Sequence, residues 1–277
     1  MSARVRGVTP DDLPPLRAIL ERDPVTHCFV TARLDEARSL GRLGADLWVF
    51  HRGDEVVSAL YVGANVIPIA SNDESRAAFA ERLRRTGRRG SSIVGPADEV
   101  LDLWSRVQPA WGAAREVRSC QPLLSIAHDP RVPADPQVRA VREDEIDVLL
   151  PACVAMFTEE VGVSPVAGGS GSAYRARIAE IVRDGRALAR IEEGAIVFKA
   201  EIGVATAGAC QVQGVWVAPD LRGTGLSEPG MAAVVAAARR HCAPIVSLYV
   251  NDYNAAARRT YAAVGFSEVG TFATILF

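Results

Sequence analysis

The sequence offers little from which to build a disulfide framework, a metal site or a membrane span. Its five cysteines are scattered and contain no CxxC pair, which is typical of reduced thiols in a cytosolic protein. Its four histidines show no HExxH or related spacing, so we expect no metal. No apolar run approaches the roughly 20 residues of a membrane helix, and the N-terminus has no secretory apolar stretch. These absences predict a soluble, cytoplasmic protein.

Charge and composition exclude further classes. The formal net charge is −2 and acids nearly balance bases, so no overall field favours nucleic acid or a membrane surface. The basic run Arg82–Arg89 lies beside Glu81 at helical spacing, which favours a solvated helix end over a nucleic-acid site. About half of the 277 residues are apolar, which is ample for one or two packed cores.

A proline-rich stretch divides the chain. Ala127–Pro136 holds three prolines and two aspartates, a composition that excludes a helix or a central strand. We interpret it as a linker, and expect an N-terminal domain at 1–126, the linker at 127–136 and a C-terminal domain at 137–277.

The two halves repeat one order of elements. Each opens with a short strand, an acidic helix start and a helix of 3.6-residue period, and each continues with a hairpin that turns at a glycine. These pieces are at 4–8, 9–20 and 47–61 in the first half, and at 138–141, 142–154 and 186–200 in the second. The order predicts a mixed α/β fold, although the identity between the halves is too low to prove duplication.

Later elements extend the comparison. The second half continues with a strand, a glycine loop, a helix, a strand, a helix and a terminal strand, which include a βαβ unit. The expected ranges are 210–218, 228–241, 245–250 and 254–264; comparable pieces of the first half lie at 73–85, 91–94 and 98–107.

The glycine loop carries the strongest chemical signal. In Val215–Ser227 a strand meets Pro219, and a short glycine-rich loop then opens a helix. Glycines allow close approach of a phosphate, and free N–H groups at a helix start attract an anion. Arg222 adds a fixed positive charge, while Thr224 and Ser227 offer hydroxyl donors. A ligand with a diphosphate is the natural guest.

Two segments together resemble the GCN5-related N-acetyltransferase (GNAT) family. Arg222–Ser227 is similar to the family's Q/R-x-x-G-x-G/A loop for the acetyl-CoA diphosphate, with Ser227 in place of the last small residue. Downstream, Asn254–Phe266 matches N-x-x-A-x-x-x-Y followed by G-F. The detailed match covers about 211–277. The resemblance implies two GNAT-like domains, each a mixed, mostly antiparallel twisted sheet flanked by helices.

The resemblance also implies roles for single residues. Acetyl-CoA would lie where two neighbouring strands splay, with the backbone of Val215 and Val217 facing its pantetheine arm. Tyr261 matches a tyrosine that donates a proton to the departing thiolate. Asn254 either binds the cofactor or caps its helix. The cofactor-binding residues expected are Val215, Trp216, Val217, Arg222, Gly223, Thr224, Gly225, Leu226, Ser227 and Asn254.

The general base is less defined. Val197, Lys199 and Glu201 share one strand face, which makes Glu201 the first candidate, although Lys199 could neutralise it in a salt bridge. Glu159 and Glu160 follow, because the family often builds its acceptor site there. The glycine-rich segment Pro165–Ser172 is either a gate or a plain mobile connection.

The first half has no counterpart of the diphosphate loop. Its equivalent stretch, Pro68–Glu74, contains no glycine and no basic residue. We therefore expect a degenerate first domain and one working acetyl-CoA site, with direct transfer to a primary amine of a small molecule or peptide and no metal. The alternative is a non-catalytic acyl-CoA-binding or protein-interaction module. The oligomeric state stays open.

Overall fold

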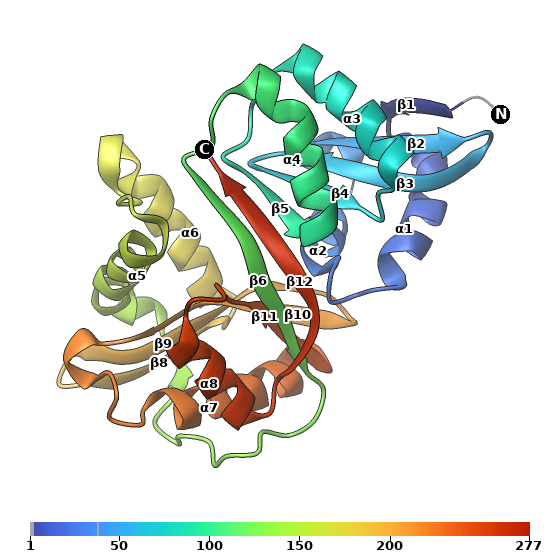
Figure 1. Cartoon of the computed structure of the whole chain (residues 1–277). Coiled ribbons are helices and arrows are strands. Elements are labelled where there is room, and N and C mark those ends of the chain that lie inside the picture. Colours follow the sequence, from blue (N-terminus) through green and yellow to red (C-terminus); the bar gives the residue numbers. More distant parts are fainter. Residues whose placement is uncertain (1–2, 38) are drawn as a thin grey trace. The chain divides into compact units, whose positions relative to one another are not determined.

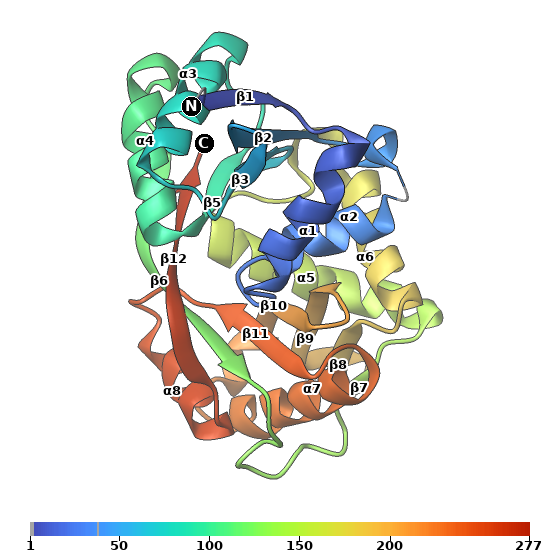
Figure 2. The ribbon, with the colours of Figure 1, turned by 90° about the vertical axis from the view of Figure 1, so that its right-hand side faces the viewer.

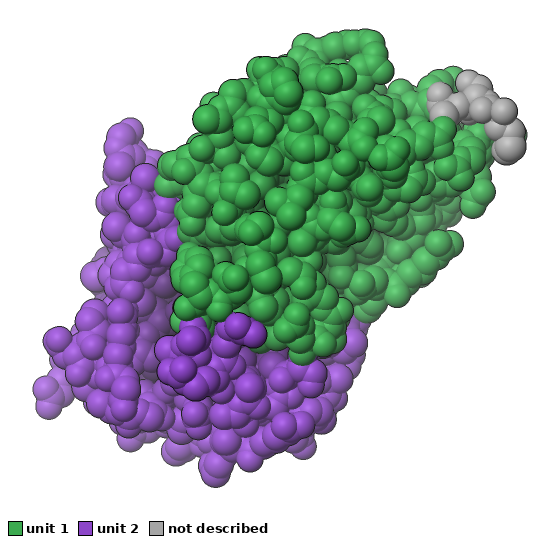
Figure 3. Space-filling model, in the orientation of Figure 1, with its two compact units in different colours: residues 1–124, 249–254, 268–277 green, residues 125–248, 255–267 purple. Residues whose placement is uncertain are grey.

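The computed structural model describes residues 3–37 and 39–277, and it divides into two compact units. Unit 1 contains residues 1–124, 249–254 and 268–277, and unit 2 contains residues 125–248 and 255–267 (Figures 1 and 3). The C-terminal strand therefore belongs mainly to the unit that the N-terminal half builds. Neither unit is one continuous stretch of chain.

Unit 1 is a mixed sheet with helices. Its strands follow the order β1-β2-β3-β4-β5-β12-β6, and in the registered pairs among them only β4 and β5 run parallel. The strands are β1 (Ala3–Gly7), β2 (Asp46–Arg52), β3 (Glu55–Val62), β4 (Asn65–Ile69), β5 (Ser92–Pro96), β6 (Glu116–Ile126) and β12 (Ser267–Leu276). The helices are α1 (Leu13–Glu21), α2 (Cys28–Glu36), α3 (Asp73–Thr86) and α4 (Ala97–Trp111).

Alternating side chains of β2 divide unit 1 into two cores. Trp48 and Phe50 point to one face, where they join apolar residues of α3 and α4. Leu47 and Val49 point to the other face and pack with residues of α1 and α2. Helices thus cover both faces of this sheet (Figure 1). The hairpin between β2 and β3 turns at Gly53 with φ of 64°, as the sequence predicts.

Unit 2 repeats the architecture with the order β11-β10-β9-β8-β7 (Figure 2). Only β10 and β11 run parallel among these pairs. The strands are β7 (Arg139–Ala140), β8 (Ala187–Glu192), β9 (Ala195–Ala205), β10 (Ala209–Val217) and β11 (Ile245–Tyr249). The helices are α5 (Ile146–Val161), α6 (Gly171–Arg183), α7 (Ser227–His241) and α8 (Ala255–Val264). The mixed, mostly antiparallel fold class expected for each unit is confirmed.

Packing in unit 2 uses one helical glycine. Apolar residues of α5 and α6 form a core with β8 and β9. On α7, a Cβ at Gly230 would lie 2.8 Å from the Phe198 ring of β9. A side chain there would push the helix away from the strand, so Gly230 sets the close approach of α7 to the sheet.

Some expectations need correction. Residues 127–136 form neither helix nor strand, as predicted, and the strand expected from 138 begins at Arg139. The stretch is bound within unit 2: Asp135 accepts from Arg190 at 2.9 Å and its N–H donates to Pro229 O at 3.0 Å. The stretch 165–172 is not all loop, because α6 begins at Gly171. The sequence analysis did not predict α2, α6 or β6. In the part of the chain that the structure describes, no helix is long and apolar enough to cross a membrane.

A buried carboxylate joins β1, β2 and the turn before α1. Asp12 accepts hydrogen bonds from two guanidinium nitrogens of Arg6, at 2.6 and 2.7 Å, and from the N–H of Thr9, at 2.7 Å. His51 Nε2 lies 3.1 Å from Oδ1 of Asp12. Burial alone would raise the pKa of Asp12, but the bonds from Arg6 and Thr9 outweigh burial and hold it at about 2.

Asp12→Asn should therefore lower the free energy of unfolding by about 2 kcal/mol at pH 7, because a folded pKa of about 2 lies well below the unfolded value near 4. A depressed pKa stabilises the fold above the unfolded pKa, and that contribution is lost as the pH falls through about 2. Urea unfolding of both proteins from pH 7 to pH 2 measures it. The exposed neighbour Asp11→Asn is the control, and a difference between wild type and Asp12→Asn that does not shrink at low pH would contradict this origin.

Candidate functional site

The loop between β10 and α7 has an open backbone. Gly223 and Gly225 have φ of 79° and 90°, and a Cβ at either position would meet nothing within 4 Å. These glycines serve the left-handed backbone conformation rather than tight packing. Their neighbours up to Gly225 are exposed. The loop therefore presents the backbone of both glycines to its surroundings.

Several amides of this loop point to no protein acceptor. Among the described residues, none accepts from the N–H groups of Gly223, Gly225 or Leu226. The first turn of α7 adds the N–H groups of Ser227 and Glu228, which have no intrahelical partner by position. Such a row of amides at the positive end of a helix dipole binds anionic oxygens.

Arg222 is held beside this loop by Glu159 of α5. Its Nη2 lies 2.7 Å from Glu159 Oε2, and its Nε donates to Val217 O at 3.1 Å. The other oxygen of Glu159 accepts the indole N–H of Trp216 at 3.3 Å. Both partners of the ion pair are about half exposed, so the pair is worth at most about 1 kcal/mol. A diphosphate with several negative oxygens could compete for the guanidinium.

Ser227 fits the start of α7. Its hydroxyl lies 3.0 Å from the hydroxyl of Thr260 on α8, and either oxygen can donate. The serine that departs from the family's small residue therefore makes a polar contact between α7 and α8. Thr224 bonds locally, donating its hydroxyl to Leu221 O at 2.7 Å.

Strands β10 and β11 part where the resemblance predicts a splay. Their parallel pairing covers only Ala209 to Gln211 of β10, opposite Ile245 to Ser247. From Val212 to Val217, β10 keeps β9 as its partner but has no registered partner in the described part of β11. Val215 and Val217 lie on the part of β10 that has parted from β11. Their contact with a cofactor stays a prediction.

A β-bulge accompanies this parting. Gln213 pairs with Glu201 and Trp216 pairs with Lys199, so Gly214 and Val215 together oppose Ala200. Gly214 has φ of 61°, which only glycine adopts readily. The sequence analysis did not use this residue, although an isolated glycine inside a strand pattern is a signal for a bulge.

Next to the bulge, side chains of β9 and α5 form a buried polar cluster. Lys199 and Glu201 form an ion pair whose side chains are 0% and 5% exposed. Cys153 Sγ lies 3.4 Å from Lys199 Nζ and 3.5 Å from Glu201 Oε1. Burial opposes both charges, but Lys199 lowers the pKa of Glu201 and Glu201 raises the pKa of Lys199, so both stay charged. A carboxylate with a lowered pKa is a weak base.

Cys153 and Tyr261 keep their protons at neutral pH. Burial raises the pKa of Cys153 to about 12, so its thiol is not a nucleophile. Tyr261 of α8 is buried against Phe266, with ring centroids 5.8 Å apart. Burial first and the charge of Glu160 second raise the pKa of the Tyr261 hydroxyl above its ordinary value. Tyr261 therefore offers an O–H donor, and Cys153 offers no activated nucleophile.

Asn254 ends a short segment that groups with unit 1. It directly precedes α8, and its N–H donates to Asn251 O at 2.9 Å. Asn251 in turn accepts from Gln121 Nε2 at 2.9 Å, and Gln121 accepts from the hydroxyl of Thr274 at 2.6 Å. The predicted residues on β10, on the following loop and on α5 belong to unit 2, and Asn254 does not.

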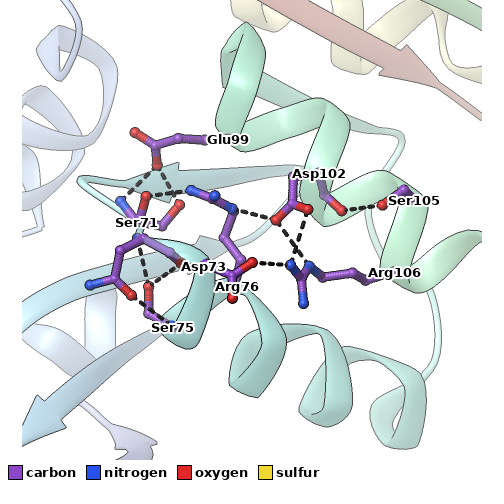
Figure 4. A network of polar contacts seen from close by, with 9 residues as sticks. Ser71, Asp73, Ser75, Arg76, Glu99, Asp102, Ser105 and Arg106 are labelled. Carbon is purple, nitrogen blue, oxygen red and sulfur yellow. Dashed lines mark hydrogen bonds and ion pairs between the residues drawn. The ribbon is translucent and has the colours of Figure 1, made fainter.

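At the equivalent helix start in unit 1, a carboxyl group of the protein itself accepts the hydrogen bonds. Glu99 of α4 accepts the N–H and the hydroxyl of Ser71, at 2.8 and 2.5 Å, just before α3 (Figure 4). Burial raises the pKa of Glu99 although the bonds from Ser71 oppose this rise. Arg76 is held by Ser71 O and Asp102 at 2.6 and 2.5 Å. The sequence predicted the missing loop but not this internal carboxylate.

Comparison with known proteins assigns both halves. Residues 45–149 match a domain of unknown function, DUF4081, and residues 166–266 match the acetyltransferase (GNAT) family. No curated protein matches the chain significantly. Over residues 166–266 the chain is therefore similar to the GNAT family. Along the chain, a match to a domain of unknown function thus precedes the match to the GNAT family.

Solved structures share the fold over nearly the whole chain. A Drosophila protein is 14% identical with a TM-score of 0.67, and covers 100% of this chain and 99% of its own. A GCN5-related N-acetyltransferase from Sphaerobacter thermophilus is 15% identical with a TM-score of 0.64, covering 99% and 95%. A tandem GNAT protein from the clavulanic acid biosynthesis pathway is 16% identical with a TM-score of 0.55, covering 99% and 98%. At these identities the likeness shows the fold. The match of residues 166–266 to the acetyltransferase (GNAT) family supports acyl transfer in general.

Glu201→Gln should lower the free energy of unfolding by about 3–5 kcal/mol, because it leaves the ammonium of Lys199 buried without a counter-charge. Chemical denaturation at pH 7 measures the loss. Glu180→Gln, on the exposed side of α6, is the control and should change little. A loss below about 1 kcal/mol for Glu201→Gln would mean that the ion pair is not closed in solution.

Proposed function

We propose that this protein transfers an acetyl group from acetyl-CoA to a primary amine of a small molecule or peptide. The observation that carries the proposal is the loop Arg222–Ser227, whose amides lack protein acceptors at the start of α7. The diphosphate of acetyl-CoA is an anion of suitable charge for these amides and for Arg222. The parting of β10 from β11 leaves strand edges that an amide-bearing pantetheine arm can pair with.

Direct transfer is the mechanism that these residues support. The amine attacks the thioester carbon, the carbonyl returns, and the CoA thiolate leaves; no covalent enzyme intermediate is required. The buried thiol of Cys153, with a pKa of about 12, supports this choice, since it offers no nucleophile. Tyr261 keeps its proton, so its hydroxyl can stabilise the departing thiolate by a hydrogen bond.

Removal of the amine's proton is assigned to Glu160. Its carboxylate is exposed at the end of α5, and its charge adds to burial in raising the pKa of Tyr261. Glu159 is engaged by Arg222 and Trp216, and would be available only after a phosphate takes Arg222. Glu201 is a weaker candidate than the sequence suggested, because Lys199 lowers its pKa inside a buried pair.

Acetyl-CoA at a hundred times its dissociation constant should add about 2.7 kcal/mol of stability, and so raise the unfolding midpoint by several degrees. Arg222→Glu should abolish this shift, because it replaces the cation at the diphosphate position with an anion. Arg240→Glu, exposed at the other end of α7, is the matched control and should keep the shift. Differential scanning fluorimetry measures all three proteins. No shift for the wild type at millimolar acetyl-CoA would exclude the proposed co-substrate.

Tyr261→Phe should lower kcat by about a hundredfold and leave the Kd for acetyl-CoA within twofold, because only the hydroxyl that meets the thiolate is lost. Thiol release during turnover with a panel of primary amines measures the rate. Tyr253→Phe, at an exposed tyrosine, is the control. A non-catalytic acyl-CoA-binding module would bind acetyl-CoA and release no thiol with any amine, and that result would support the alternative function.

A further inference from the structure

Stability alone does not account for the buried ion pair of β9. Both charges of Lys199 and Glu201 are removed from water, at 0% and 5% exposure. Desolvation of two charges often cancels their attraction, so apolar residues of similar volume would make the core at least as stable. The residues around Lys199 and Glu201 therefore indicate a role of the ion pair other than stability.

Besides Cys153 of α5, the pair contacts the part of β10 that contains the bulge. Gln213 Nε2 donates to Glu201 Oε2 at 3.4 Å. A Cβ on Gly214 would lie 3.2 Å from Lys199 Nζ and 3.3 Å from Glu201 Cδ, so the bulged backbone lies directly against both charged groups. Across the ladder, a Cβ on Gly203 would lie 2.4 Å from Gln213 Oε1. Both glycines leave the room that these polar side chains need.

The pair also flanks the bulge in the ladder. Lys199 pairs with Trp216, Glu201 pairs with Gln213, and the single residue between them opposes the two bulged residues. The ion pair holds the two β9 side chains together on one face, next to Gly214. The bulge comes within three residues of the last β10–β11 pair, at Gln211. The Lys199–Glu201 ion pair of β9 thus lies beside the part of β10 that no longer pairs with β11.

We propose that Lys199 and Glu201 are positioning residues for acetyl-CoA: their ion pair holds the Gly214 bulge and with it the free edge of β10. The proposal rests on the proposed function, because it assigns the pantetheine arm to that edge. Neither side chain touches the reacting atoms in this role. The pair acts through the backbone of Gly214 and Val215. Two apolar side chains in place of the ion pair would orient that backbone less strictly.

The double variant Lys199→Met/Glu201→Leu tests this role. It replaces both charges by apolar groups of similar size, so the protein should stay folded with little loss in unfolding midpoint. Its Kd for acetyl-CoA, measured by calorimetry without any acceptor, should rise at least about tenfold, as expected when a backbone binding edge shifts. Gly214→Ala should weaken binding in the same direction, because φ of 61° and the nearby Lys199 Nζ oppose a side chain.

A matched pair on the neighbouring strand is the control. Arg190 and Glu192 of β8 form an ion pair with the same two-residue spacing. Arg190 also binds Asp135, and the register shift beside the pair lies between β8 and β9, not in β10. Arg190→Met/Glu192→Leu should leave the Kd for acetyl-CoA within twofold of wild type. A control that weakens binding as strongly as the Lys199/Glu201 variant would overturn the proposal.

The remaining outcomes separate this role from others. A folded Lys199/Glu201 variant with unchanged Kd but lost transfer would make Glu201 a base and overturn the positioning role. If that variant does not fold, Gly214→Ala decides, and unchanged binding there overturns the proposal. A wild-type protein that binds no acetyl-CoA would refute the proposed function itself, and this role with it. Weaker binding by both variants, with normal binding by the control, is the result we expect.

Discussion

From Val212 to Val217, β10 has a strand on one side and none on the other within the described part of unit 2. Backbone N–H and C=O groups on such an edge need a partner, either water or a ligand. The parting of β10 and β11 creates this edge, and the bulge at Gly214 fixes how the strand continues beyond it. The loop Arg222–Ser227 begins a few residues after the end of β10, so the direction in which β10 ends determines where the loop starts.

The two units treat the same topological position differently. In unit 2 a strand leads through Gly223 and Gly225 to the first turn of α7, and the loop amides stay without protein acceptors. In unit 1 the strand β4 leads through Ser71 to α3, where Glu99 supplies the anionic oxygen from within the protein. A buried carboxylate on these donors would repel a phosphate and already satisfies the hydrogen bonds a phosphate would make. At this position of unit 1, Glu99 thus takes the place that an anionic ligand would need.

Electrostatics in unit 2 separates exposed from buried pairs. The Arg222–Glu159 pair is half exposed, is screened by water and can exchange Glu159 for another anion at little cost. The Lys199–Glu201 pair is buried, and neither partner can leave without exposing the other to a large desolvation penalty. A ligand can therefore compete for Arg222, whereas Lys199 and Glu201 stay fixed. This contrast is the physical basis for assigning binding to one pair and positioning to the other.

Local patterns in the sequence determined much of the fold: the β2–β3 and β8–β9 hairpins, α3, α7 and α8 follow from two- and 3.6-residue periods with glycine and asparagine at their ends. The loop Arg222–Ser227 and the segment Asn254–Phe266 could be singled out for the same reason, since the motifs that they resemble consist of residues close in the chain. Tertiary structure decided what depends on distant residues. It joined β12 to unit 1, placed Glu99 on Ser71, brought Cys153 to Lys199 and Glu201, and paired Glu159 with Arg222. No short-range pattern encodes these contacts, because burial and pairing between residues tens of positions apart arise only when the sheet and its helices pack.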